Sequence, residues 1–236
     1  MGSVAGWVWG LIHPMVLLGS WIYVFSVCLK QQLPPGQPGN YPLFLFAGQL
    51  PWLLFSETVQ RSSSSLIEHA GLITKTVFPA EMVPLSVFLS SLISHLLALF
   101  LMIVAAAIWV HSLGPVLALL PLYMLLLGLF AVGIGWVVAA LQVYLRDTAQ
   151  VVTVILTVWF WLTPILIFES QVPKRLRILI YANPLARVVS AYRQVLLATE
   201  APSWRDTGVL AVYGLAAFFL GGLVFRHLKR GFADVL

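Results

Sequence analysis

Residues 116–144 read VLALLPLYMLLLGLFAVGIGWVVAALQVY, a stretch without one charged side chain. A helix that crosses a bilayer needs about 20 predominantly apolar residues, and this stretch exceeds that length. The rest of the chain is similar, because 61% of its 236 residues are hydrophobic and only 9% are charged. A soluble domain carries about 25% charged residues. The sequence therefore predicts a membrane protein.

Working outward from residues 116–144, we find five further apolar runs, separated by polar or Pro/Gly-rich segments. We predict an all-α polytopic protein, a single transmembrane domain over residues 1–236, with six membrane-spanning helices. The expected spans are about Trp7–Leu29, Tyr41–Gln60, Met82–Val110, Val116–Tyr144, Thr148–Phe168 and Thr207–Phe225. The first run is too long for a signal peptide and lacks a basic start.

Six spans place both chain ends on one side of the membrane. Lys and Arg number six on the side of the chain ends and seven on the opposite side. The positive-inside rule therefore leaves the orientation open.

The polar stretch RSSSSLIEHAGLITKTVFPAEMVPL, residues 61–85, is too long for a turn. Ser65 and Glu68 fit a capping box, and apolar residues recur behind them at helical spacing. Pro79 ends the pattern. We predict a short amphipathic helix at about residues 65–78, lying on the membrane surface. The residues alone leave open whether it only turns the chain or docks a soluble partner.

Several function classes lack their motifs. The chain has no G-x-x-x-x-G-K-[ST] phosphate loop, so any ATP must bind another chain. The five histidines are dispersed, and we expect no metal site, no catalytic residue and no cofactor on this chain. A secondary transporter would show repeat symmetry and more mid-membrane charge than His95. We expect His95 to form a hydrogen bond between helices rather than to line a pathway. A membrane glycosyltransferase would need acidic catalytic motifs that the sequence lacks.

LIEHAGLITKTVFPAEMVPL, residues 66–85, resembles the first cytoplasmic loop of the permease subunits of type-2 ABC exporters, in the branch that moves O-antigen, capsule and teichoic-acid polymers. Further similar pieces follow in the family's order and cover nearly the whole chain. They are PLFLFAGQLPWLLFSE at 42–57, VYLRD at 143–147, WFWLTPILIFESQVP at 159–173, NPLARVVSAYRQVLL at 183–197 and FRHLKRGFADVL at 225–236.

This resemblance implies a non-enzymatic permease that exports a lipid-linked polysaccharide across the bacterial plasma membrane, with both termini in the cytoplasm. Its implied partners are a second copy of itself, two ABC ATPase subunits that hold ATP and Mg²⁺, the lipid-linked polymer and membrane lipids, with no nucleic acid. An exporter of small molecules or drugs is the alternative.

The resemblance also implies three sets of site residues. The helix at 65–78 would couple to the ATPase through Glu68, His69, Ala70, Leu72, Ile73 and Thr74. A re-entrant pair of gate helices would occupy about residues 172–199, broken at Asn183–Pro184, with Arg187 and Arg193 either lining the exit or reaching lipid phosphate. Aromatic rings stack on the C–H faces of sugars, so the candidate channel residues are Trp21, Tyr23, Phe25, Trp159 and Trp161. Packing against lipid is their alternative.

The family begins with a basic amphipathic interface helix before a Gly-Ser-x-Leu-Gly turn. Here the chain begins MGSVAG, with the turn nearly intact and the basic helix missing. We expect that the start of the chain has been assigned too late.

Overall fold

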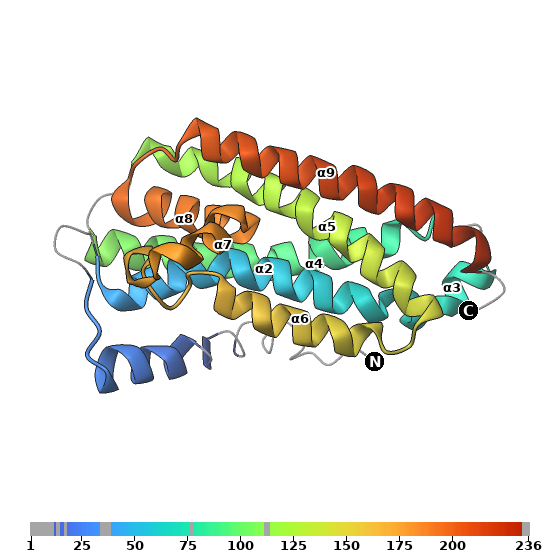
Figure 1. Cartoon of the computed structure of the whole chain (residues 1–236), viewed down its shortest axis with the longest axis horizontal. Coiled ribbons are helices and arrows are strands. Elements are labelled where there is room, and N and C mark those ends of the chain that lie inside the picture. Colours follow the sequence, from blue (N-terminus) through green and yellow to red (C-terminus); the bar gives the residue numbers. More distant parts are fainter. Residues whose placement is uncertain are drawn as a thin grey trace.

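A computed structural model describes residues 12, 15–16, 18–33, 39–75, 78–110 and 114–232, and these residues contain helices and no β-strand. Figure 1 shows an elongated bundle whose long helices run roughly side by side along its length. The long helices are α2 (Tyr41–Glu68), α4 (Met82–Trp109), α5 (Leu120–Tyr144), α6 (Thr148–Leu162) and α9 (Trp204–Leu228). The prediction of an all-α membrane protein is confirmed.

Three segments in the described part of the chain are long and apolar enough to cross a membrane. They are α4, the stretch Pro115–Tyr144 that joins the 3-10 turn η2 (Pro115–Leu119) to α5, and α9 together with the turn η6 (Lys229–Gly231). They match the expected third, fourth and sixth spans to within a few residues. Part of the expected first span lies outside the described residues, and its visible part includes a π-helix, η1 (Ile22–Cys28). The count of six spans remains a prediction.

The second helix is longer than predicted, and the expected capping box does not form. α2 continues through the serine run as far as Glu68, so Ser65 lies inside the helix rather than at its start. Its hydroxyl donates to the Ser62 carbonyl at 2.8 Å, and Ser63 donates to the Gln60 carbonyl at 2.6 Å. Serine hydroxyls that donate to carbonyls of their own helix have their hydrogen bonds satisfied inside it, so the helix can continue through the serine run. The predicted helix at 65–78 is therefore wrong in its start, and only α3 (Ala70–Lys75) is a separate short helix.

The expected fifth span reaches only Leu162 as a helix, six residues short of the prediction at Phe168. Thr163 adopts an extended conformation, with φ −97° and ψ 130°. Its neighbour Pro164 disfavours the helical region for the residue before it. The chain then passes through irregular backbone before the short turns η3 (Glu169–Gln171) and η4 (Lys174–Leu176).

Helices α5 and α9 pack closely through glycines. A Cβ added at Gly221 of α9 would overlap the carbonyl oxygen of Gly133 in α5, and one added at Gly133 would overlap the carbonyl of Ala217. Small residues allow membrane helices to approach this closely and to gain van der Waals contact. The α5–α9 pair therefore forms a tightly packed side of the bundle, visible along the upper edge of Figure 1.

The two ends of the bundle carry different short elements. α3 lies at one end, near the C-terminal end of α9, while α7 (Arg177–Ala182) and α8 (Pro184–Arg193) lie at the opposite end (Figure 1). α8 continues into a π-helical turn, η5 (Gln194–Ala198). The fold thus separates the two segments that the sequence singled out, and α2 runs between them.

Candidate functional site

The corner between α2 and α3 is built around His69. Its backbone leaves the helical region at φ −106° and ψ 18°, which ends α2. The His69 Nδ1 lies 2.8 Å from the Ser65 carbonyl, and the His69 carbonyl accepts the N–H groups of Leu72 and Ile73 at 3.0 and 3.1 Å. His69 therefore joins the end of one helix to the start of the next.

The predicted coupling residues lie together at this corner, on different sides of it. Glu68 is exposed and accepts a hydrogen bond from the Ser64 hydroxyl at 2.6 Å. His69 and Leu72 are exposed, Ala70 and Ile73 are half-buried, and Thr74 lies in α3. Ile73 packs against a buried cluster at this end of the bundle. That cluster consists of Leu66, Ala80, Val83, Ala139, Ala140, Val143, Phe225 and Phe232.

The loop after α3 is bonded to the ends of two long helices. Glu81, the residue before α4, accepts hydrogen bonds from Lys229 of η6 at 2.9 Å to each carboxylate oxygen. The Glu81 carbonyl accepts a bond from the Trp136 indole of α5 at 3.0 Å. Partial burial alone would raise the pKa of Glu81, but the hydrogen bond from Lys229 and the positive charges of Lys229 and Arg226 hold it below its usual value.

An apolar groove of about 300 Å³ lies beside the corner. It is lined by His69, Leu72, Phe78, Met82, Val83, Leu85, Ser86 and Leu89. Leu72 and Met82 are exposed. This end of the bundle therefore combines a short helix, a groove and an ion pair to α9.

At the opposite end, Asn183 connects three segments and explains the break between α7 and α8. Its side-chain oxygen accepts the N–H of Leu185 at 3.0 Å, which caps α8, and the indole N–H of Trp159 at 2.9 Å. Its amide donates to the Thr163 hydroxyl at 3.0 Å. The predicted break at Asn183–Pro184 is confirmed, with Pro184 in the first turn of α8.

Arg193, which the sequence suggested for the exit, is engaged by the protein itself. Its guanidinium donates to the carbonyls of Pro164 and Ile165, each at 2.7 Å, and of Phe44 at 3.2 Å. It also lies 3.4 Å above the centre of the Phe44 ring. The carbonyls after α6 have no helical partners because the helix has ended, and Arg193 supplies them. Arg193 therefore joins α8 to α2 and to the loop after α6.

Arg187, the second predicted exit residue, lies on the same helix and is also paired. Its guanidinium forms an ion pair with Asp206 in the first turn of α9 and donates to the Tyr181 carbonyl at 2.7 Å. One-fifth of the Arg187 side chain is exposed. Both arginines of α8 thus tie the short helices to the bundle.

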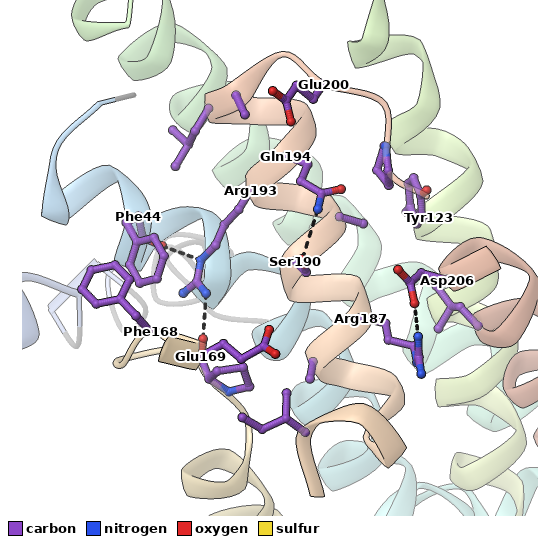
Figure 2. Close-up of a pocket in the computed structure, with 18 of the residues that line it drawn as sticks. Phe44, Tyr123, Phe168, Glu169, Arg187, Ser190, Arg193, Gln194, Glu200 and Asp206 are labelled. Carbon is purple, nitrogen blue, oxygen red and sulfur yellow. Dashed lines mark hydrogen bonds and ion pairs between the residues drawn. The ribbon is translucent and has the colours of Figure 1, made fainter. Parts of the chain in front are cut away.

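A cavity of about 560 Å³ opens between α8, the start of α9 and the loops at this end. Figure 2 shows Ser190 of α8 and Gln194 of the following turn η5 facing this space, with Glu169 below Arg193, Glu200 above Gln194, and Asp206 with Arg187 on the right. A hydrogen bond to the Glu169 carboxylate raises the pKa of Tyr181, whose side chain also lines the cavity.

The five aromatic residues predicted for a channel occupy different environments. Trp159 points into the bundle, where it packs edge-on against Phe55 with ring centres 5.2 Å apart. Trp21 stacks on Phe160 at 5.1 Å. Phe25 is half-buried, with its ring centre 6.4 Å from that of Tyr41, whereas Tyr23 and Trp161 expose 62% and 67% of their surface. Their role in a channel remains a prediction.

His95 forms the expected link between helices. Its Nε2 lies 3.0 Å from the Tyr192 hydroxyl, and both residues are buried. The bond joins α4 to α8 and confirms the interpretation from sequence.

Some contacting residues were missed by the sequence analysis. The pair Glu81–Lys229, the Asp206 partner of Arg187 and the cavity acids Glu169 and Glu200 join positions far apart in the chain. Glu81 falls inside the motif LIEHAGLITKTVFPAEMVPL, which was the one available signal.

The chain is similar along most of its length to proteins named for the export of O-antigen or the transport of polysialic acid. The O-antigen export system permease protein RfbA of Myxococcus xanthus is 27% identical over 99% of this chain and 88% of its own length. The protein of that name from Klebsiella pneumoniae is 29% identical over the same shares. The polysialic acid transport protein KpsM of Escherichia coli is 23% identical over 94% of this chain and 85% of its own length.

A family model describes the same relationship independently of single relatives. The ABC-2 type transporter model matches residues 2–197, which include α3, the break at Asn183–Pro184 and both arginines of α8. The chain therefore belongs to the ABC-2 type transporter family.

Proposed function

We propose that this chain is the permease subunit of an ATP-driven exporter that moves a lipid-linked polysaccharide across the bacterial plasma membrane. The observation that carries the proposal is the match to relatives named for O-antigen and polysialic acid over nearly the whole chain, within the ABC-2 family. These names do not favour the alternative of a small-molecule exporter. The polymer, its direction of travel and its lipid carrier are parts of the proposal.

The topology in this proposal has six spans with both chain ends in the cytoplasm. α2 and α6 would cross the membrane together with the three clear spans, and the first apolar run would provide the sixth. The α3 corner would then face the cytoplasm and the α7–α8 pair the outside. The placement of these elements at opposite ends of the bundle supports that orientation (Figure 1).

The proposed engine is a separate ABC ATPase, two copies of which would bind ATP and Mg²⁺ beneath a dimer of this chain. The α3 corner is the proposed contact, with Glu68 and His69 exposed to a partner and Ile73 directed toward the buried cluster. A push on α3 would therefore reach the packed ends of α5 and α9 through that cluster. The ion pair from Glu81 to Lys229 provides a second route to α9.

α2 is the proposed route to the external gate. It is helical from Tyr41 to Glu68, and 28 residues at 1.5 Å each span about 42 Å. Its far end holds the Phe44 carbonyl and ring that Arg193 of α8 contacts. Displacement of the His69 corner would therefore be transmitted through α2 to α8. The proposed re-entrant pair α7–α8 would then open the exit.

The test is copurification of this chain with an ABC ATPase from its own cells, together with polymer export in cells that lack this chain. The proposal expects the two proteins to copurify and expects cells lacking this chain to accumulate lipid-linked polymer on the cytoplasmic side, with export restored by the intact gene. Copurification with an ATPase, but unchanged polymer export in cells lacking this chain, would favour a different cargo. Absence of any ATPase partner would overturn the proposal.

A further inference from the structure

The cavity between α8 and the start of α9 has the size and lining of a binding site. Its volume of about 560 Å³ falls within the range of about 300–1,000 Å³ typical of small-molecule sites. It lies within one copy of the chain, bounded by α8, α9, α5 and the loops around Glu169 and Glu200. A single copy of the chain therefore provides this space.

The polar groups of this cavity are hydrogen-bonding side chains of several kinds. Glu169, Ser190, Gln194 and Glu200 come from three segments and line the same space (Figure 2). Carboxylates accept hydrogen bonds, amides both donate and accept, and hydroxyls do both. A ligand with many hydroxyl groups is the chemical match for such a mixture.

Charge in the cavity selects against anions. Arg193 donates to three backbone carbonyls, and the two terminal nitrogens of Arg187 donate to Asp206 and the Tyr181 carbonyl, while the buried Arg187 Nε has no hydrogen-bond partner among the described residues. Glu169 and Glu200 form no ion pair with the described residues. The lining thus holds three carboxylates, Glu169, Glu200 and Asp206, against two guanidinium groups, Arg187 and Arg193, so it carries one net negative charge. A phosphate or a carboxylated sugar entering here would meet like charge.

An aromatic face completes the set. Tyr181 lines the cavity with 53% of its surface exposed. The face of a pyranose ring carries apolar C–H groups, and an exposed tyrosine ring offers apolar area at low conformational cost. Phe44 also lines the cavity but offers less ring surface for stacking on a sugar, since the Arg193 guanidinium covers one of its faces.

We infer that this cavity binds one or two uncharged sugar units, with Tyr181 stacking on a sugar face and Glu169, Gln194 and Glu200 holding its hydroxyls. This inference rests on the proposed function and deepens it. It assigns the chain a sugar subsite at the junction of α8 and α9 and predicts that the part of the exported polymer bound there is neutral.

Binding is tested on the full-length chain in lipid nanodiscs by saturation-transfer NMR. The probes are the methyl glycosides of glucose, galactose and mannose, with N-acetylneuraminic acid and inorganic phosphate as anionic probes. We expect saturation of at least one neutral glycoside and a clearly weaker signal from both anions. Equal or stronger binding of an anion, or no binding of any neutral glycoside, would overturn the inference.

Variants locate the signal. Tyr181→Ala is expected to lower the affinity for the glycoside about tenfold, because a stacking contact of roughly 1.4 kcal/mol is lost. Trp204→Ala is the control, because Trp204 is an exposed aromatic residue at the start of α9 that does not line the cavity. A loss of binding that is the same in both variants would contradict the assignment.

The double variant Glu169→Gln, Glu200→Gln tests the charge argument. It keeps the hydrogen-bonding shape and removes the two carboxylates, so N-acetylneuraminic acid is expected to gain signal relative to the neutral probe. Glu57→Gln is the control, because Glu57 lies in α2 outside the cavity and is paired with Arg61. This control is expected to change neither the signal of N-acetylneuraminic acid nor that of the neutral probe. An unchanged ratio in the double variant would overturn the role of the carboxylates.

The outcomes separate this inference from the proposed function. Normal polymer export by Tyr181→Ala, together with no glycoside binding by the unaltered chain, overturns the subsite and leaves the permease proposal standing. Glycoside binding that Tyr181→Ala removes, in a chain that associates with no ATPase, supports the subsite and overturns the permease proposal.

Discussion

Lys229, in the turn that follows α9, donates to both carboxylate oxygens of Glu81, the residue before α4, at 2.9 Å each. The two positions are 148 residues apart in the chain. The Glu81 carbonyl also accepts a hydrogen bond from the indole N–H of Trp136. Glu81 therefore connects two long helices at the end of the bundle that contains α3. The loop after α3 is therefore fastened to α5 and α9 at one residue.

Breaking this pair is expected to weaken coupling more than folding. Both side chains are about 37% exposed, and a pair of this exposure contributes about 1 kcal/mol or less. We expect Lys229→Met and Glu81→Gln to lower polymer export while ATP hydrolysis by the complex stays near normal and the free energy of unfolding falls by about 1 kcal/mol or less. The exchanged pair Glu81→Lys, Lys229→Glu should recover export. Failure of the exchange, with both single variants defective, would show that the individual groups matter rather than their attraction.

The pair also gives a pH dependence. The pKa of Glu81 is lower in the folded protein than in the unfolded chain, so the folded form holds the carboxylate more strongly ionised. Its contribution is therefore complete above the ordinary glutamate pKa and is lost as the pH falls through the lowered value. We expect thermal unfolding of the unaltered chain and of Glu81→Gln to converge at acid pH. A difference in melting temperature that persists below the lowered pKa of Glu81, where the carboxyl is protonated in the folded protein as well, would contradict this.

The α5–α9 contact is expected to be the most sensitive to small substitutions. Gly221→Ala would force a methyl group against the Gly133 carbonyl, so the helices must separate, at a cost of about 1–3 kcal/mol. Gly208→Ala, on the same helix, has open space and should be neutral or slightly stabilising, since alanine favours helix by about 1 kcal/mol. Thermal unfolding in detergent measures both. Equal effects of the two variants would contradict the close packing.

Arg193 is expected to tolerate no conservative replacement. Arg193→Lys keeps the charge but cannot reach three carbonyls with a planar fork, and it loses the face of Phe44. We expect export to fall strongly while assembly with the ATPase is kept, because the ATPase contact lies at the other end. Copurification and polymer export measure the two effects. Export at the unaltered level in Arg193→Lys would show that the α8 clamp is dispensable.

The α3 corner gives the direct test of coupling. Glu68→Lys combined with His69→Ala reverses an exposed charge and removes the bond to the Ser65 carbonyl. We expect ATP hydrolysis to continue while polymer export stops. The control Glu57→Lys also reverses a carboxylate of α2, half-buried and paired with Arg61 eleven positions before Glu68, and should leave export intact. Normal export by the double variant would remove the corner from the mechanism.

Much of the fold was predictable because it follows from local composition. The α4, α5 and α9 boundaries lie within a few residues of the apolar runs, and Asn183–Pro184 marked a real helix start. The capping box at Ser65 failed because serine hydroxyls can serve either a helix start or a helix interior, and sequence does not decide between these partners. Pro164 carried the signal for the early end of α6, since it follows Thr163 directly.

The site was less predictable, since its contacts join distant positions. Arg193 was predicted to line the exit or to reach lipid phosphate, and its carbonyl partners, 28 to 149 residues away in the chain, were not foreseen. Helical spacing placed Arg187 on the same helix and gave no sign of Asp206 as its partner. The cavity acids Glu169 and Glu200 belong to loops without a periodic pattern, so nothing in the sequence brought them together.

The unbroken course of α2 has a consequence for its rotational phase. One residue inserted between Pro51, which lies inside α2, and the serine run at 62–65 would rotate the His69 corner by about 100° relative to the Phe44–Arg193 contact. Seven inserted residues would nearly restore the angle, at about 20° from the original, while lengthening the helix by roughly 10 Å. The rotation of α2 about its axis, as well as its length, therefore fixes how the His69 corner lies relative to the Phe44–Arg193 contact. A change in the length of α2 keeps both contacts aligned only if it adds or removes nearly whole helical turns.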